Sequence, residues 1–257
     1  MEPSTDFTEI RLPIALGVLL LLLSWEIIQP FFERFARGKG AWKRRGLNAS
    51  FNLGLGAINA VIVSGLFVGL WATTMAWTEV HHVGLLNWLP VTGFSRGLLA
   101  ILLLDAWTYL WHRMNHTVPV LWRFHRLHHA DREMNVTTAN RFHFGEIVLS
   151  SILRLPILAL LGVNIEELAI YDTMLFAAVQ FQHANIGLPE WLDRTLRYFL
   201  VTPHLHKVHH SVVRTEADSN FSSMFSWWDR LFRTYRLSRD LRKIKFGVDD
   251  GAQRYEQ

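Results

Sequence analysis

The 257-residue sequence predicts an all-α integral membrane protein, with about three spanning helices and a helical hairpin capped by a cytoplasmic, histidine-rich helical domain. Three observations predict this class. Half of the residues are hydrophobic and, with 11 Trp, are gathered into long apolar runs. One loop is strongly basic, and most of the 13 His stand in three short clusters. Cysteine is absent, which excludes a disulfide framework, a thiolate zinc site and a cysteine nucleophile.

Four apolar regions are long enough to enter a bilayer, whose hydrocarbon core of ~30 Å takes about 20 helical residues. They cover residues 12–28, 53–77, 89–111 and 147–182. The first lacks a basic leader and a small-residue cleavage site, which favours a retained anchor over a signal peptide. The last is interrupted by "GVNIEE" at 162–167, so we expect a helical hairpin that spans or partly enters the membrane.

The orientation follows from the loop between the first two apolar regions. Against one acidic residue, Glu33, this loop carries six basic residues: Arg34, Arg37, Lys39, Lys43, Arg44 and Arg45. The positive-inside rule places such a loop in the cytoplasm. Counting spans from there puts the histidines between His112 and His210 on the cytoplasmic face. His81 and His82 fall on the opposite face, where we interpret them as interfacial residues.

Three histidine clusters, "HRMNH", "HRLHH" and "HLHKVHH", are the strongest chemical signal in the sequence. On a helix, side chains three or four residues apart share one face, so each cluster can direct two or three imidazoles to one point. Buried neutral imidazoles need partners, and a metal ion supplies one. Eight or more exceed what one ion takes, which predicts a di-metal domain. The candidate ligands and catalytic residues are His112, His116, His125, His128, His129, His206, His209 and His210.

Two further histidines stand at the ends of the last apolar region, His143 in "RFHFGE" and His183 in "FQHANIG". Both are candidate metal ligands, although His143 would serve equally as a polar anchor at the membrane interface. Asp105 shares a helical face with the first cluster, inside an apolar run where a charge is costly. We expect its carboxylate to accept the second ring N–H of a ligand histidine, unless it pairs with another polar group. Glu146 and Asp229 are weaker candidates for this role.

The order and spacing of these clusters resemble the fatty acid hydroxylase/sterol desaturase superfamily, the integral membrane histidine-box di-iron oxygenases. The pattern of that superfamily is H-x3-H followed by two H-x2-H-H boxes, and the three clusters match it. The flanking stretches "DAWTYLWHRMNH", "RFH", "TPHLHKVHH" and "DSNFSSMFSWWDRLFRTY" are similar as well. The resemblance implies a catalytic domain over residues 95–236, after an N-terminal transmembrane region over 1–94 and before a polar tail over 237–257.

The resemblance also implies an activity, the O2-dependent hydroxylation or desaturation of a lipid at two iron ions. The substrate would be a sterol, a fatty acyl chain or a related alkyl chain taken from the bilayer, with no nucleic acid involved. No cytochrome b5 segment is fused to the chain, so electrons would come from a separate cytochrome b5-like or ferredoxin-like protein. The end "RYEQ" carries no retrieval signal, which favours a bacterial inner membrane over the endoplasmic reticulum.

The sequence departs from the superfamily at three positions. Phe144 stands where Pro is common, and Ser222 and Arg233 stand where Gly is common. None of the three is a presumed ligand, so these departures bear on the substrate pocket rather than on the metals.

Other functions stay open at this point. A metal transporter would place its binding groups near the bilayer midplane on broken helices, whereas these imidazoles lie outside the predicted spans. A membrane zinc hydrolase would normally carry H-E-x-x-H, which does not occur. A metal-binding membrane protein without oxygenase activity remains as the alternative.

Overall fold

The long apolar stretches of the chain form its longest helices, as expected where lipid offers the backbone no hydrogen-bond partner. The computed structural model describes residues 5–248. The α-helices are α1 (Thr5–Ile28), α2 (Glu33–Ala36), α3 (Ala41–Leu66), α4 (Val68–Val80), α5 (Leu85–Trp88), α6 (Gly93–Thr117), α7 (Pro119–His129), α8 (Phe144–Leu161), α9 (Ile165–His183), α10 (Glu190–Leu196), α11 (Pro203–His209), α12 (Arg214–Ala217) and α13 (Trp227–Leu231). Two 3-10 turns are η1 (Val136–Asn140) and η2 (Leu241–Lys243). Residues 5–248 contain no β-strand beyond isolated bridges, which confirms the all-α class.

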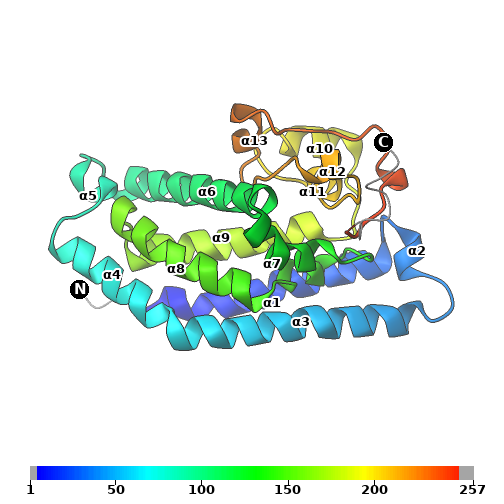
Figure 1. The fold of residues 1–257 in the computed structure, drawn as a ribbon, viewed down its shortest axis with the longest axis horizontal. Coiled ribbons are helices and arrows are strands. Elements are labelled where there is room, and N and C mark those ends of the chain that lie inside the picture. Colours follow the sequence, from blue (N-terminus) through cyan, green and yellow to red (C-terminus); the bar gives the residue numbers. More distant parts are fainter. Residues whose placement is uncertain (1–4, 249–257) are drawn as a thin grey trace.

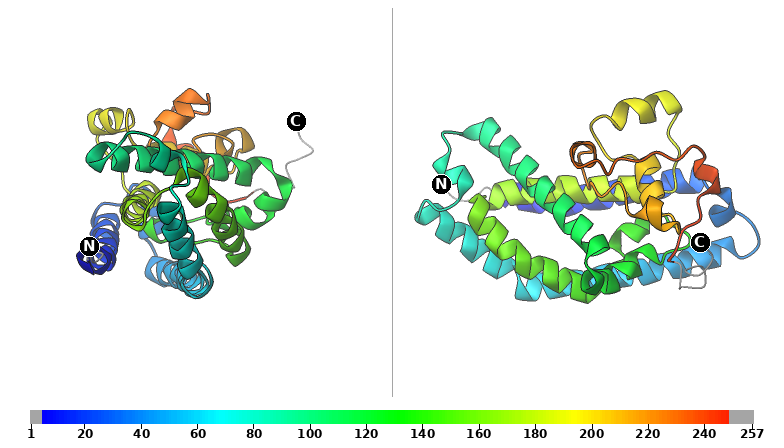
Figure 2. Two further views of the ribbon diagram at one scale, coloured as in Figure 1. Left: turned by 90° about the vertical axis from the view of Figure 1, so that its left-hand side faces the viewer. Right: turned by 45° about the horizontal axis from the view of Figure 1, so that its top comes forward.

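The long helices lie side by side along the longest axis of the molecule (Figure 1). Helix α1 packs against α9, α3 and α4 pack against α8, and α6 packs against α9. Seen from the end, these helices form one bundle, with the short helices α10–α13 gathered at one side (Figure 2). The main core within the bundle includes Trp71, Met75, Leu104, Leu158 and Tyr171.

The predicted hairpin between α8 and α9 is confirmed. Gly162 takes the left-handed conformation, with φ of 68°, that ends α8. Asn164 then caps α9, because its side chain accepts from the Glu167 backbone N–H at 2.8 Å and the Glu167 carboxylate accepts in return from the Asn164 N–H at 2.9 Å. Arg96 of α6 donates to Glu167 and to the Gly162 carbonyl, both at 2.8 Å, and so fixes the hairpin tip.

The spans differ in detail from those predicted. By length and composition α3 and α8 can each cross a membrane, and a third span results if residues 68–88 and 93–117, bent by 85°, count as one. The expected span over 53–77 is broken at Phe67, just after the Ser64–Gly65 pair, a combination that often kinks helices. The apolar part of α1, Pro13–Ile28, is a shorter apolar helix.

The two ends of the bundle carry different features. The basic loop lies around α2 at the same end as α7 and α11, while α5 lies at the other end (Figure 1). Arg34 donates to the Ile244 carbonyl at 2.8 Å, and Arg44 pairs with Glu133 at 3.1 Å. The basic loop thus lies on the same side of the molecule as the histidine clusters, and the membrane face to which they belong stays a prediction. His81 is the C-cap of α4, and the turn between α4 and α5 lies at the opposite end (Figure 1).

The segment predicted to begin a polar tail at residue 237 is packed over its first part. Ile244 and Phe246 are buried in a small core with Phe32, Met134 and Val208. Ser211 also forms an isolated bridge with Phe246. Ile244 and Phe246 of this segment are therefore packed against the rest of the chain, and residues 249–257 lie outside the described part of the chain.

Candidate metal centre

The last turns of α6 meet α7 and α11 at one end of the bundle and bring the three histidine clusters together. Within residues 5–248, nine buried imidazoles form two groups whose ligand atoms lie within 4.8 Å of one another. Group one is His112, His116, His125, His129 and His209. Group two is His128, His183, His206 and His210. The eight histidines predicted as ligands from the three clusters are all included, together with His183, whereas His204 of the third cluster is in neither group.

Helix geometry explains how the clusters divide. Residues four apart share a face, so His125 and His129 of α7 both enter group one, while adjacent His128 points about 100° away into group two. Helix α11 does the reverse, sending His206 and His210 to group two and His209 to group one. Each H-x-x-H-H box therefore contributes to both groups.

The nitrogen positions fit a shared cation. His183 Nε2 lies 3.1 Å from His128 Nε2 and 3.0 Å from His206 Nε2. Nitrogens that share one ion at about 2.0–2.1 Å are typically separated by about 3 Å. Many of the buried ring nitrogens have no hydrogen-bond partner in the described structure, although a buried polar atom normally has one. These include Nε2 of His125, His129 and His209 and both ring nitrogens of His116 and His210, whereas the unpartnered ring atom of His128 and of His206 is Nδ1.

The other ring nitrogens of several ligands are held by hydrogen bonds. His112 Nδ1 lies 2.8 Å from the Phe221 carbonyl, His209 Nδ1 lies 2.7 Å from the Ser219 carbonyl, and His183 Nδ1 lies 2.7 Å from the Val179 carbonyl. A carbonyl can only accept, so each Nδ1 carries the proton and each Nε2 is free to bind a metal.

Burial keeps the imidazoles in the neutral form that binds metal. It lowers the pKa of His128, His129, His206 and His210 well below the usual value, and neighbouring imidazoles lower it further. Burial likewise lowers the pKa of His209 to about 3. The chemistry of this donor set, two compact groups of neutral imidazoles, suits first-row transition metals such as iron, copper or zinc.

Two of the predicted site residues have other hydrogen-bond partners. His143 belongs to neither group, because its Nδ1 accepts from the Gly145 N–H at 2.9 Å and caps α8. Among the described residues Asp105 receives no imidazole N–H; its carboxylate accepts instead from the Phe225 N–H at 3.0 Å and from the Trp228 indole at 2.8 Å.

The role expected of Asp105 is filled by the weaker candidate Glu146. Its Oε1 lies 2.9 Å from His125 Nδ1, and both side chains are buried. Asp229 contacts no ligand histidine directly but accepts from the Phe221 and Ser222 backbone N–H groups. The Phe221 carbonyl in turn orients His112.

Replacing Glu146 with glutamine should weaken metal binding at group one by about 10–100-fold, the usual cost of losing a carboxylate that orients a ligand histidine. Titration of the metal-free protein against a chromophoric chelator measures this. The matched control is Glu166→Gln, an exposed carboxylate on α9, which should leave the affinity unchanged. An affinity at group one equal to that of the wild type would contradict the role of Glu146.

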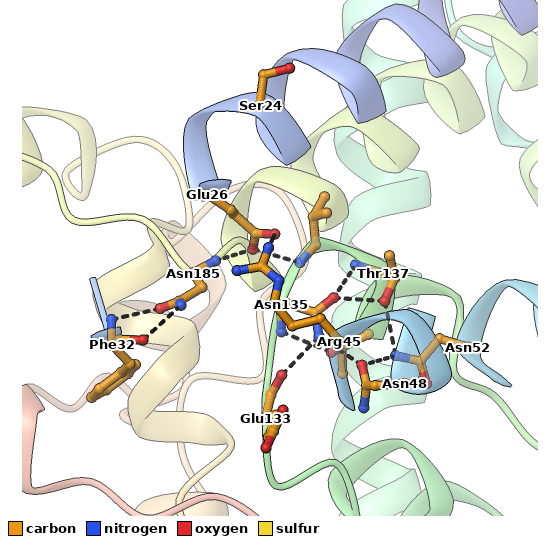
Figure 3. A network of polar contacts seen from close by, with 12 residues as sticks. Ser24, Glu26, Phe32, Arg45, Asn48, Asn52, Glu133, Asn135, Thr137 and Asn185 are labelled. Carbon is orange, nitrogen blue, oxygen red and sulfur yellow. Dashed lines mark hydrogen bonds and ion pairs between the residues drawn. The ribbon is translucent and has the colours of Figure 1, made fainter. Parts of the chain in front are cut away.

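A polar network from the N-terminal helices fixes the loops that follow α7 and α9 (Figure 3). Glu26 of α1 is fully buried and accepts from the Val136 N–H at 2.8 Å and from the Asn185 N–H. Asn52 of α3 donates to the Thr137 hydroxyl at 3.0 Å. Asn185 comes two residues after His183, so α1 helps to set the position of group two.

Replacing Glu26 with leucine should lower the free energy of unfolding by about 1–3 kcal/mol for each buried N–H that it leaves without an acceptor. Thermal unfolding in detergent checks this. Glu26→Gln keeps one acceptor oxygen and should cost less. Equal stability of Glu26→Leu and the wild type would show that the network is not important for the fold.

A cavity of about 410 Å³ lies between α6, α8 and α9 and reaches the metal groups. Its walls include imidazoles of both groups: His112, His125, His128, His183 and His206. Much of the remaining lining is apolar or aromatic, with Trp71, Trp107, Trp111, Phe142 and Phe176 among it. The volume is in the range of small-molecule sites.

Taken together, the described residues form a helical fold with two or three helical segments long and apolar enough to cross a membrane, and two histidine groups that could each hold a metal ion next to a mostly apolar cavity. The family model described as fatty acid hydroxylase matches residues 97–234. The chain belongs to this family.

Curated relatives of the chain are lipid-modifying enzymes. Alkylglycerol monooxygenase of Xenopus tropicalis is 29% identical over 62% of this chain and 34% of its own length. Ornithine lipid hydroxylase OlsE of Rhizobium tropici is 30% identical over 54% of this chain and 41% of its own length. Cholesterol 25-hydroxylase of Rattus norvegicus is 23% identical over 62% of this chain and 54% of its own length. The similarity thus spans about a third to a half of these relatives. No solved structure matches the chain significantly.

Proposed function

We propose that this chain is a membrane-bound, O2-dependent oxidoreductase that hydroxylates or desaturates a lipid at two iron ions. The observation that carries this proposal is the meeting of two buried imidazole groups with an apolar cavity between membrane helices. Family membership and the relatives, which are named as lipid hydroxylases and monooxygenases, support it.

The residues of this chain have distinct tasks in such a reaction. The nine imidazoles would hold the metals, and bound iron would supply the activation of O2. The carbonyls of Phe221, Ser219 and Val179 keep three of the rings in the required tautomer, and Glu146 orients His125. The apolar walls hold an alkyl body near the metals and exclude water.

The same proposal includes a location and a donor. The basic loop and the metal groups share one end of the bundle, so the positive-inside rule supports a cytoplasmic site. A bacterial inner membrane is favoured, and one of the relatives is bacterial. Electrons would come from a separate cytochrome b5-like or ferredoxin-like protein.

Mass spectrometry of lipids tests the proposal. Purified protein is loaded with iron and incubated with bilayer lipids, a reductant and O2, with zinc-loaded protein and His128→Ala as controls. We expect a lipid that gains one oxygen atom or loses two hydrogen atoms with the iron-loaded wild type alone. Full metal binding without any lipid change would instead support a metal-binding protein that lacks oxygenase activity.

A further inference from the structure

An ion pair lines the cavity inside the α8–α9 hairpin. Arg154 of α8 and Asp172 of α9 meet through two contacts, Nη1 to Oδ2 at 3.1 Å and Nη2 to Oδ1 at 3.0 Å. The two side chains remain 20% and 24% exposed. Helix α8 is otherwise apolar over its middle, and charges at this depth are costly and tend to be functional. The metal groups do not need this pair, because it contacts none of the imidazoles.

The pair lies at the end of the cavity away from the metals. One face of α8 lines the cavity from Glu146, beside His125, to Arg154, a rise of about 12 Å over eight residues. One face of α9 lines it from His183 to Asp172, a rise of about 16 Å over eleven residues. An elongated ligand can therefore reach the ion pair with one end and the metal groups with the other.

The chemistry of the pair limits what it can bind. Two N–H groups of Arg154 are used by Asp172, which leaves other guanidinium donors and carboxylate lone pairs for a ligand. The Trp71 ring lies 5.0 Å from the guanidinium carbon, and Ser150 and Ser151 also line the cavity near this end. Because the two charges cancel, the site offers hydrogen bonds without a net charge. A free carboxylate would meet repulsion from Asp172, whereas hydroxyl groups could donate to Asp172 and accept from Arg154.

We propose that Arg154 and Asp172 form a head-group subsite that selects lipids with a neutral, hydroxyl-bearing polar end and holds their alkyl chain toward the metal groups. This deepens the proposed function, on which it rests for the reaction itself. The subsite should discriminate against free fatty acids and against hydrocarbons that lack a polar end.

Equilibrium binding to the purified protein in detergent tests this without any turnover. The probes are radiolabelled 1-O-hexadecylglycerol, hexadecanoic acid and hexadecane, which share a chain length and differ in polar end. The wild type should bind the glycerol ether most tightly. The double variant Arg154→Met with Asp172→Leu should bind the ether about 10-fold or more weakly, since hydrogen bonds to charged groups are lost, and should bind hexadecane no less tightly than the wild type.

Two further variants keep the test decisive. The exchanged pair, Arg154→Asp with Asp172→Arg, should preserve the preference for the ether if the double variant folds poorly. Arg194→Met with Glu190→Leu removes an exposed ion pair of α10 and should change nothing. Equal binding of the ether and the fatty acid by the wild type, or an unchanged preference in the double variant, would overturn the subsite. A clear preference in a protein that oxidises no lipid would leave the subsite standing and reject the proposed function.

Discussion

Replacing His183 with alanine is expected to remove the metal of group two and to lower lipid oxidation by more than about 100-fold, since even loss of a partner outside the ligand set commonly costs 10–100-fold. His183 is the member of group two that comes from α9, and its Nε2 lies close to Nε2 of both His128 and His206. Its loss leaves three imidazoles around that centre. Metal content after gel filtration, together with lipid oxidation, measures the effect.

His143→Ala is the matched control for that variant. His143 directly precedes α8, as His183 ends α9, so the two residues flank the same apolar hairpin in the sequence. The His143 ring caps α8 and belongs to neither group. We expect it to retain both metals. If His183→Ala kept both metals while His143→Ala lost one, the assignment of the two residues would be reversed.

Replacing His209 with alanine should weaken metal binding at group one and lower lipid oxidation less than His183→Ala does, because four imidazoles remain there, as many as group two has in the wild type. His209 Nε2 is buried without a hydrogen-bond partner, while its Nδ1 is held by the Ser219 carbonyl. The ring is thus fixed for binding at one nitrogen. The same measurements of metal content and lipid oxidation apply, and metal retained by group two should be detectable in this variant.

His204→Ala is the control on the same helix. Its Nδ1 lies 3.4 Å from an Asp193 carboxylate oxygen, and it is in neither group. Metal content should therefore remain at the wild-type level. An identical loss of all metal from His209→Ala and His183→Ala would contradict two separable centres and indicate a single one.

The sequence identified which histidines gather, but the division into two groups was not drawn from it. The signal was present, since the adjacent pairs His128–His129 and His209–His210 must point in different directions on a helix. The division of these histidines into two groups could therefore have been predicted from helical spacing. His183, outside the boxes, was identified only by its position where the apolar run ends.

Two predicted site residues have partners that the sequence did not indicate, one through contacts far along the chain and one through a local bond. Asp105 binds the backbone of Phe225 and the indole of Trp228, about 120 positions away, and no local pattern shows such partners. His143 was placed by its position at the membrane edge, but a local capping bond turns its ring away from the metals.

The C-terminal segment carried a signal that composition concealed. Ile244 and Phe246 alternate with polar residues, as in a segment with one buried face, although their surroundings are strongly basic. The helix break at Phe67 also had a local sign in the Ser64–Gly65 pair.

Anaerobic titration of Fe(II) into metal-free, purified wild-type protein tests the central claim most directly, because it counts the ions that the nine imidazoles hold. We predict saturation at two tightly bound ions per chain. Saturation at one ion, or binding too weak to saturate, would contradict the two-centre site.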